Sequence, residues 1–304
     1  MSDKPARRKA VATDTLAPTF AGAAVMSVVM YPVDVVRALC MSNPGLGAKD
    51  ALTGFLNTHG VMGFVKQGMA VEVFRSSLAR GIKFWVQPLA HEAFFGPEKQ
   101  GTYLTKGASG VIAVFPEVWA ISAMENIKLA QQLDKDKKFN GAADVTRHLL
   151  KTRGFFGGLY CGYFGMQIRQ CLFTGGTFLT IDMCKDAIRS GGISNPTVVD
   201  IVGGFMSGVF GVALNCWTDV VRSVIQKNQI QASFDPSIPR PPTLEPLNPV
   251  PFFQETANIM KAKGLGGLYA GVGPKMIHLG IGNSILFYLM PRFKAMWFDY
   301  KGLY

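Results

Sequence analysis

Three short segments of the sequence place an acidic residue three positions before a basic one, and they recur at nearly equal intervals along the chain. They are Asp34 with Arg37, Glu125 with Lys128, and Asp219 with Arg222. A glutamine follows the base by four residues in the second and third segments, at Gln132 and Gln226. Residues three apart on a helix share one face. Each segment therefore offers one carboxylate and one cation for ion pairs that can form and break.

A second pattern follows each of these segments. A glycine-framed turn stands at 63–68, 158–162 and 267–271, a basic residue comes seven positions later, and a phenylalanine nine positions after that. The basic residues are Arg75, Arg169 and His278, and the phenylalanines are Phe84, Phe178 and Phe287. Two patterns that coincide three times at matched spacing indicate an internal threefold repeat.

The elements that carry these residues are apolar and long enough to cross a bilayer, which takes about 20 residues. Some contain a single charge, such as Lys106 or Glu117. A charge at this depth should face protein or a watery cavity, because it costs about 2.5–3.5 kcal/mol in lipid. Six spans are predicted, at 13–40, 69–95, 103–131, 161–188, 197–227 and 271–298. Small residues predict close helix packing at Gly107 and Gly110, and at Gly204, Gly208 and Gly211.

The composition agrees with a membrane protein. The 304 residues are 48% hydrophobic and only 17% charged, with a net charge of +11. This excludes a disordered chain, and the scattered basic residues argue against a nucleic-acid binder. The five cysteines form no C-x-x-C pair, and the four histidines lack metal-ligand spacing. We therefore expect no metal site and no cofactor, and we find no constellation of residues typical of an enzyme.

The domain boundaries follow the repeat. We expect a polar N-terminal tail at 1–12 and then three repeats, at 13–98, 99–192 and 193–304, within a single membrane domain. The third repeat is the longest because it holds a proline-rich loop at about 233–251, which should be extended rather than helical.

With these motifs the chain resembles the mitochondrial carrier family over about residues 13–298. It departs from the family where Ala123 and Trp217 replace the proline that Pro32 retains. The resemblance implies an all-α membrane protein with six transmembrane helices in three pseudo-threefold repeats and amphipathic helices on the matrix side. It also implies the mitochondrial inner membrane, both termini in the intermembrane space, and transport by alternating access.

The resemblance assigns the acid–base segments to a matrix-side gate that joins the odd-numbered spans. The implied pairs are Asp34 with Lys128, Glu125 with Arg222, and Asp219 with Arg37, and Gln132 and Gln226 belong to the same gate. The alternative is that these ions only staple neighbouring helices together. Either way, a partly desolvated pair that loses one partner costs on the order of 3–5 kcal/mol.

The family's intermembrane-side network is eroded in this chain. It survives as Asp182 and Lys185 in the second repeat, and a cross-repeat pair of Asp182 with Lys294 is expected. We therefore predict a weak gate at this end and a cavity open to that side.

Substrate contacts are implied at matched depths on the even-numbered spans: Arg75, Arg169 with Gln170, and His278. An Arg–Gln pair at the second position is similar to the carboxylate and keto-acid branch of the family. Lys83 fits the citrate-type carriers, and Arg80 lies one position from their usual lysine. Arginine suits a carboxylate because its planar fork can bind both oxygens. His278 would add charge only when protonated.

Two acids leave alternatives open. Arg75 and Arg169 would bind protein rather than substrate if they paired with Glu72 or Glu117. Glu117, inside the third span, either pairs with a cavity base or carries a proton.

These observations predict an inner-membrane carrier that exchanges small anionic metabolites, namely di- or tricarboxylates or keto acids. The alternative is a transport-inactive, carrier-like structural subunit of an inner-membrane complex such as a respiratory complex, which the missing prolines and the eroded network favour. The expected partners are the anionic metabolite and inner-membrane lipids, including cardiolipin at the N-termini of the matrix-side helices. No nucleic acid is expected.

Overall fold

The computed structural model describes residues 12–42, 48–60, 69–96, 101–133, 141–233, 245–269 and 271–302. These ranges are almost entirely helical and contain no strand. The long helices are α1 (Leu16–Ser42), α4 (Ala70–Phe95), α5 (Tyr103–Leu133), α7 (Tyr163–Ser190), α8 (Pro196–Ala232) and α10 (Val272–Lys301). Each coincides with one predicted span to within a few residues, so the predicted all-α, six-helix architecture is confirmed.

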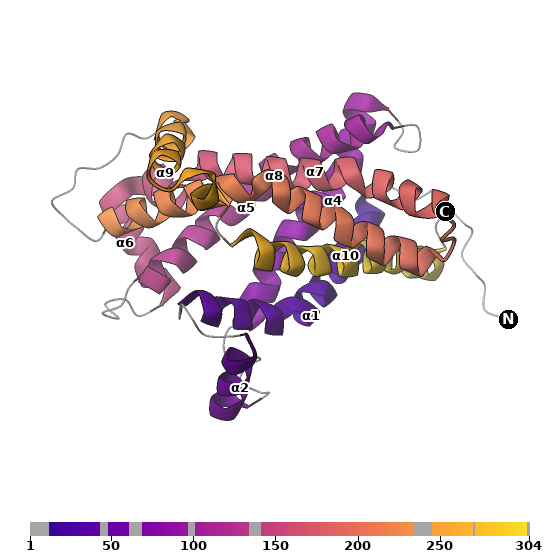
Figure 1. Ribbon diagram of the computed structural model, residues 1–304, viewed down its shortest axis with the longest axis horizontal. Helices are drawn as coiled ribbons and strands as arrows, with labels where there is room; N and C mark the ends of the chain where they lie inside the picture. The colour runs from indigo at the N-terminus through magenta and orange to yellow at the C-terminus, as the bar shows by residue number, and fades with distance from the viewer. Residues whose placement is uncertain are drawn as a thin grey trace.

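The six long helices form a closed ring. Each packs against the next one along the chain, and α10 packs against α1. Figure 1 shows them running along the length of the molecule. A ring closed in this order leaves one central space that every long helix can line.

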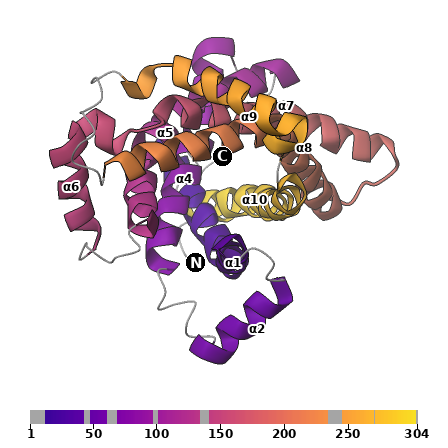
Figure 2. The ribbon, with the colours of Figure 1, turned by 60° about the vertical axis from the view of Figure 1, so that its left-hand side comes forward.

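Three shorter helices follow the first, third and fifth long helices, α1, α5 and α8. They are α2 (Ala48–His59), α6 (Ala142–Gly154) and α9 (Val250–Leu268). They gather at one end of the molecule, opposite the last turn of α10, and α2 stands apart from the bundle in both views (Figures 1 and 2). Short turns of 3-10 or π helix occur at Ala12–Thr15, Phe155–Leu159 and Glu245–Leu247.

Three predicted features lie partly or wholly outside the described ranges. The tail at 1–12 and the glycine turn at 63–68 lie outside them, apart from Ala12. The loop at 233–251 was predicted to be extended, but its described part holds the turn Glu245–Leu247 and the first residues of α9. That part of the prediction is wrong, because proline is well tolerated in the first turn of a helix.

Within the described ranges, three helices are long and apolar enough to cross a membrane by length and composition: Thr13–Val36, Tyr103–Gln131 and Pro196–Ala232. Large apolar side chains such as Phe115, Trp119 and Phe210 are exposed on their outer faces. The remaining long helices, α4, α7 and α10, carry most of the basic residues that line the central space, and these charges lower their mean hydropathy. The polar positions thus point into the bundle, as a lipid-embedded helix requires.

Glycine seams bring neighbouring helices close together, as predicted. A Cβ atom built on Gly204 of α8 would lie 2.9 Å from the backbone oxygen of Asn283 in α10, and one on Gly208 would lie 3.0 Å from the Cα of Gly280. On α5, a Cβ atom built on Gly110 would lie 2.7 Å from the ring of Phe178. Small residues allow such approaches, which supply the packing that holds helices together in lipid.

Replacing Gly204 by alanine tests this seam. We expect the free energy of unfolding to fall by about 1–3 kcal/mol, because the new methyl group has to push the backbone of α10 away. Denaturation in detergent measures the change. Gly266→Ala is the matched control, since its Cβ would meet nothing within 4 Å. Equal effects at the two positions would contradict close packing between α8 and α10.

Candidate functional site

The ring of long helices encloses a cavity of about 380 Å³, a size typical of small-molecule sites. Six basic and five acidic side chains line it, together with His278. All six predicted substrate-contact residues are among the lining residues: Arg75, Arg80, Lys83, Arg169, Gln170 and His278. The structure therefore brings together side chains that are spread over most of the sequence.

One end of the cavity, toward the end of α10, is closed by three aromatic rings. Phe84 lies 5.2 Å from Phe178 and 5.6 Å from Phe287 between ring centroids, and Phe178 and Phe287 are 6.3 Å apart. Tilted and edge-on rings at these distances attract one another. We predicted a weak closure and an open cavity at this end, and that prediction is wrong. The three rings, one from each repeat, pack together at the end of the cavity where few ion pairs were expected.

At the other end a chain of ion pairs joins α4, α5 and α8. Glu72 contacts Lys128 at 3.0 Å and forms a tight pair with Arg75. Arg75 also reaches Glu125 at 3.2 Å, and Glu125 pairs with Arg222 at 3.1 Å. The Glu125–Arg222 pair was predicted from the sequence and is present.

The partners of the other two gate acids differ from the predicted ones. Asp34 lies 2.8 Å from Nε2 of His278, and Lys128 contacts Glu72 instead of Asp34. Asp219 pairs with Lys275 at 2.8 Å and lies 3.6 Å from Arg169. The side chains of Arg37 and Gln132 lie outside the described part of the chain. In this conformation, Asp34 and Asp219 each contact a basic residue of α10, His278 and Lys275 respectively.

Gln226 binds the gate residue Arg222 and connects it to α5. It accepts a hydrogen bond from Arg222 Nε at 2.8 Å and donates one to Asn126 Oδ1 at 2.9 Å. Gly162, with φ of 67°, begins α7 directly against it, and a Cβ there would lie 2.6 Å from Gln226 Cγ. The glycine turn of the second repeat is therefore required both by its backbone conformation and by this contact.

Sequence reasoning missed Lys275 as a gate residue and considered Glu72 only as a competitor for Arg75. Glu72 stands three residues before Arg75, and Lys275 three residues before His278. This spacing puts both on the same helix face as a predicted contact residue. Residues three apart share one face of a helix, and this spacing on α4 and α10 could have identified both residues from the sequence.

The middle of the cavity holds Glu117, which the sequence left unexplained. Its Oε1 lies 3.2 Å from Lys83 Nζ and accepts a hydrogen bond from Gln170 at 2.8 Å. Arg80 donates to Ser27 Oγ at 2.9 Å, and no carboxylate of the described residues is within ion-pair distance of it. Nε of Arg169 is buried and has no hydrogen-bond partner. Arg75, by contrast, is occupied by Glu72 and Glu125, as the alternative interpretation expected.

Beyond the aromatic rings, ion pairs staple neighbouring helices. Lys185 contacts Asp200 at 2.9 Å, and Arg292 contacts Asp200 at 3.2 Å, which links α7, α8 and α10. Asp182 pairs with Lys106 of α5, so the pair predicted between Asp182 and Lys294 is replaced by a contact to the adjacent helix. Lys106 is nearer because α5 packs directly against α7.

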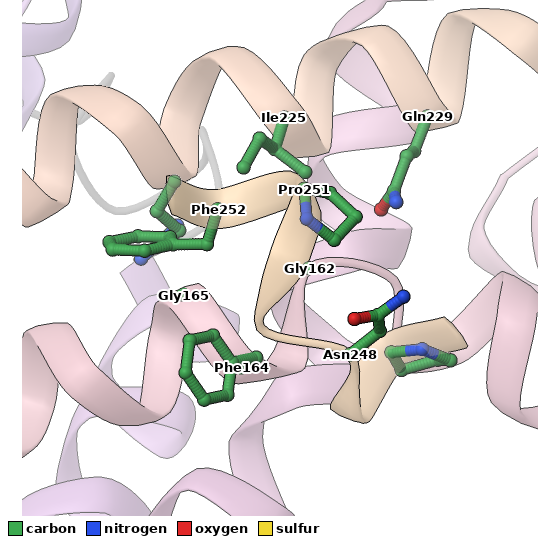
Figure 3. Close-up of a pocket in the computed structure, with 10 residues that line it drawn as sticks. Gly162, Phe164, Gly165, Ile225, Gln229, Asn248, Pro251 and Phe252 are labelled. Atoms are coloured by element: carbon green, nitrogen blue, oxygen red, sulfur yellow. The ribbon is translucent and has the colours of Figure 1, made fainter. Parts of the chain in front are cut away.

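A second, much smaller pocket of about 20 Å³ lies where α7, α8 and α9 meet. Phe164, Ile225, Asn248 and Phe252 surround it (Figure 3). Its volume suffices for about one water molecule. The central cavity is therefore the candidate functional site.

Comparisons with known proteins agree with this architecture. The family model described as "Mitochondrial carrier protein" matches residues 8–97, 99–192 and 194–301. The chain is 26% identical over 274 residues to the "Mitochondrial citrate transporter D" of Aspergillus niger, with 85% of each chain covered. It is 25% identical over 265 residues to the "Probable mitochondrial 2-oxodicarboxylate carrier" of Dictyostelium discoideum, covering 85% of this chain and 82% of the relative. It is 27% identical over 284 residues to the "Mitochondrial 2-oxodicarboxylate carrier 2" of Saccharomyces cerevisiae, with 85% of each covered.

Glu125→Gln tests the ionic end of the cavity. The change removes the acid shared by Arg75 and Arg222, and we expect the free energy of unfolding to fall by about 1–3 kcal/mol because two partly buried cations lose an acceptor. Denaturation in detergent measures it. Asp186→Asn is the control, since its pair with Arg189 is more than half exposed and should contribute less than about 1 kcal/mol. An equal loss in both variants would contradict the proposed importance of Glu125.

Proposed function

The chain belongs to the mitochondrial carrier protein family, and we propose that it exchanges small carboxylates across the mitochondrial inner membrane. The substrate class is di- or tricarboxylates or keto acids, and the residues that bind it are those of the central cavity. Members of this family are transporters and not enzymes. The relatives named for citrate and 2-oxodicarboxylates support the substrate class.

The observation that carries the proposal is the pair of guanidinium groups with unfilled donors. Among the described residues, Arg80 hydrogen-bonds only to the hydroxyl of Ser27. Nε of Arg169 is buried and makes no hydrogen bond, and the nearest carboxylate oxygen, on Asp219, lies 3.6 Å away. A carboxylate binds guanidinium in a two-point fork, and its charge strengthens both hydrogen bonds. Two such cations, on α4 and α7, suit a substrate with at least two carboxylates.

Alternating access requires one end of the cavity to open as the other closes. In the conformation described above the aromatic rings close one end. Movement to the opposite state would let Asp34 exchange His278 for Lys128, and Asp219 exchange Lys275 for Arg37, while Glu125 keeps Arg222. Because each of these acids has a basic residue within reach in both arrangements, the acids gain a partner as they lose one, and the free-energy difference between the states stays small.

The orientation of the bundle belongs to the same proposal. We place the end with α2, α6 and α9 in the matrix and both termini in the intermembrane space. The three repeats, at 13–98, 99–192 and 193–304, would then move as units. Inner-membrane lipids would cover the exposed apolar faces, with cardiolipin at the N-termini of α2, α6 and α9.

Trp217 favours a second candidate function. It stands where the family has a kink proline, and its ring lies 5.9 Å from that of Phe252 in α9. This contact ties the middle part of α8 to a neighbouring helix. A stiffened hinge suits a transport-inactive structural subunit of an inner-membrane assembly such as a respiratory complex.

Uptake of labelled citrate, malate and 2-oxoglutarate into liposomes that contain the purified protein tests the transport function. We expect uptake that depends on an internal counter-substrate. Arg80→Gln and Arg169→Ala should each lower it at least tenfold, because a charge-assisted hydrogen bond contributes about 1.5–3 kcal/mol and about 1.4 kcal/mol corresponds to a factor of ten.

Arg189→Gln is the matched control, since this exposed arginine at the end of α7 lies outside the cavity and should leave uptake unchanged. Absence of uptake by folded protein would reject the carrier. Stoichiometric co-purification with a respiratory complex in mild detergent would then support the structural subunit.

A further inference from the structure

Glu117 is the most deeply buried of the five acids that line the cavity, with 1% of its side chain exposed. Its two oxygens have different surroundings. Oε1 accepts a hydrogen bond from Gln170 Nε2 at 2.8 Å and lies 3.2 Å from Lys83 Nζ. Oε2 is buried and has no hydrogen-bond partner.

This asymmetry matches a carboxylic acid. An ionised carboxylate spreads its charge over both oxygens, and a buried charged oxygen without a donor is costly. In the protonated form one oxygen acts as a carbonyl acceptor and the other carries the hydrogen. Oε1 with two donors and Oε2 with none fit these two roles. The position is therefore suited to hold a proton.

The charged residues near Glu117 favour its ionised form instead. Lys83 and Arg80 on α4 and Arg169 on α7 are the cations that face Glu117, and Cys171 on α7 is the other titratable neighbour. Cations stabilise the ionised acid, whereas burial and the missing donor favour the protonated one. Because the two influences oppose each other, a modest change of charge in the cavity can move a proton on or off.

An anionic substrate supplies such a change. Carboxylates bound to Arg80 and Arg169, as in the proposed function on which this inference rests, neutralise the cations that stabilise ionised Glu117. We propose that Glu117 takes up one proton when the substrate anion binds, and that anion and proton cross the membrane together. The proton comes from solvent and returns to solvent when the substrate leaves and Arg80 and Arg169 again stabilise the ionised acid. By linkage, the proton raises the affinity for the anion as much as the anion raises the affinity for the proton.

Binding of 2-oxoglutarate to the full chain in detergent tests the proposal, since both carboxylates of this ligand are ionised near pH 7. Calorimetry in two buffers of different ionisation enthalpy counts the protons taken up per anion. We expect an uptake approaching one proton, and an affinity that falls by up to about tenfold per pH unit as the pH rises. In Glu117→Gln both effects should disappear.

Glu92→Gln is the matched control, because this exposed acid near the end of α4 lies outside the cavity and the variant should take up protons like the wild type. If Glu117→Gln fails to fold, infrared spectra replace it. The wild type should gain a protonated-carboxyl band when substrate binds. Lys83→Gln should show that band without substrate, because the nearest cation is gone.

The outcomes separate the two proposals. Binding without proton uptake in the wild type would overturn the role of Glu117 and leave the carrier function intact. Proton uptake that persists in Glu117→Gln would also overturn it and assign the proton to another group, such as His278. Neither binding nor liposome uptake of any carboxylate would overturn the carrier function and, with it, the coupling.

Discussion

The cost of burying charge inside a membrane-spanning bundle governs the rest of this structure. Six basic and five acidic side chains face one cavity, and every one of these acids lies within ion-pair distance of a basic side chain. Pairing reduces the penalty of removing these charges from water. Arg80 has no carboxylate of the described residues within ion-pair distance, and the buried Nε of Arg169 makes no hydrogen bond, so these two cations are the least neutralised by protein. A cavity that is nearly neutral yet has cations left over is stable when empty and still attracts an anion.

The architecture could be predicted from the sequence because its causes are local. Bilayer thickness fixes the length of each span, and glycines such as Gly204 mark the faces where helices meet. The threefold recurrence of acid–base segments then fixed the order of the elements and the depth of each site residue. The resemblance to the carrier family named the expected contact residues at those depths, and all six of them line one cavity.

The partners of those residues could not be predicted in the same way. Sequence spacing gives the depth of a side chain along its helix, but the choice between two cations at one depth depends on helix tilt and rotation. The contacts of Asp34 with His278 and of Asp219 with Lys275 depend on the tilt and rotation of these helices. Glu117 shows the same limit, because only the packing of α4 and α7 against α5 reveals which of its oxygens has donors.

The aromatic closure gives the two ends of the cavity unequal sensitivity to their surroundings. Contacts among Phe84, Phe178 and Phe287 carry no net charge, so dissolved ions scarcely weaken them. The pairs around Glu125 and Asp219 are electrostatic, and counterions that enter the cavity weaken them over a screening length of about 8 Å at physiological ionic strength. Salt thus weakens the ion pairs at one end of the cavity and leaves the aromatic contacts at the other end nearly unchanged. The ionic strength of the two compartments therefore becomes a factor in which way the cavity faces at rest.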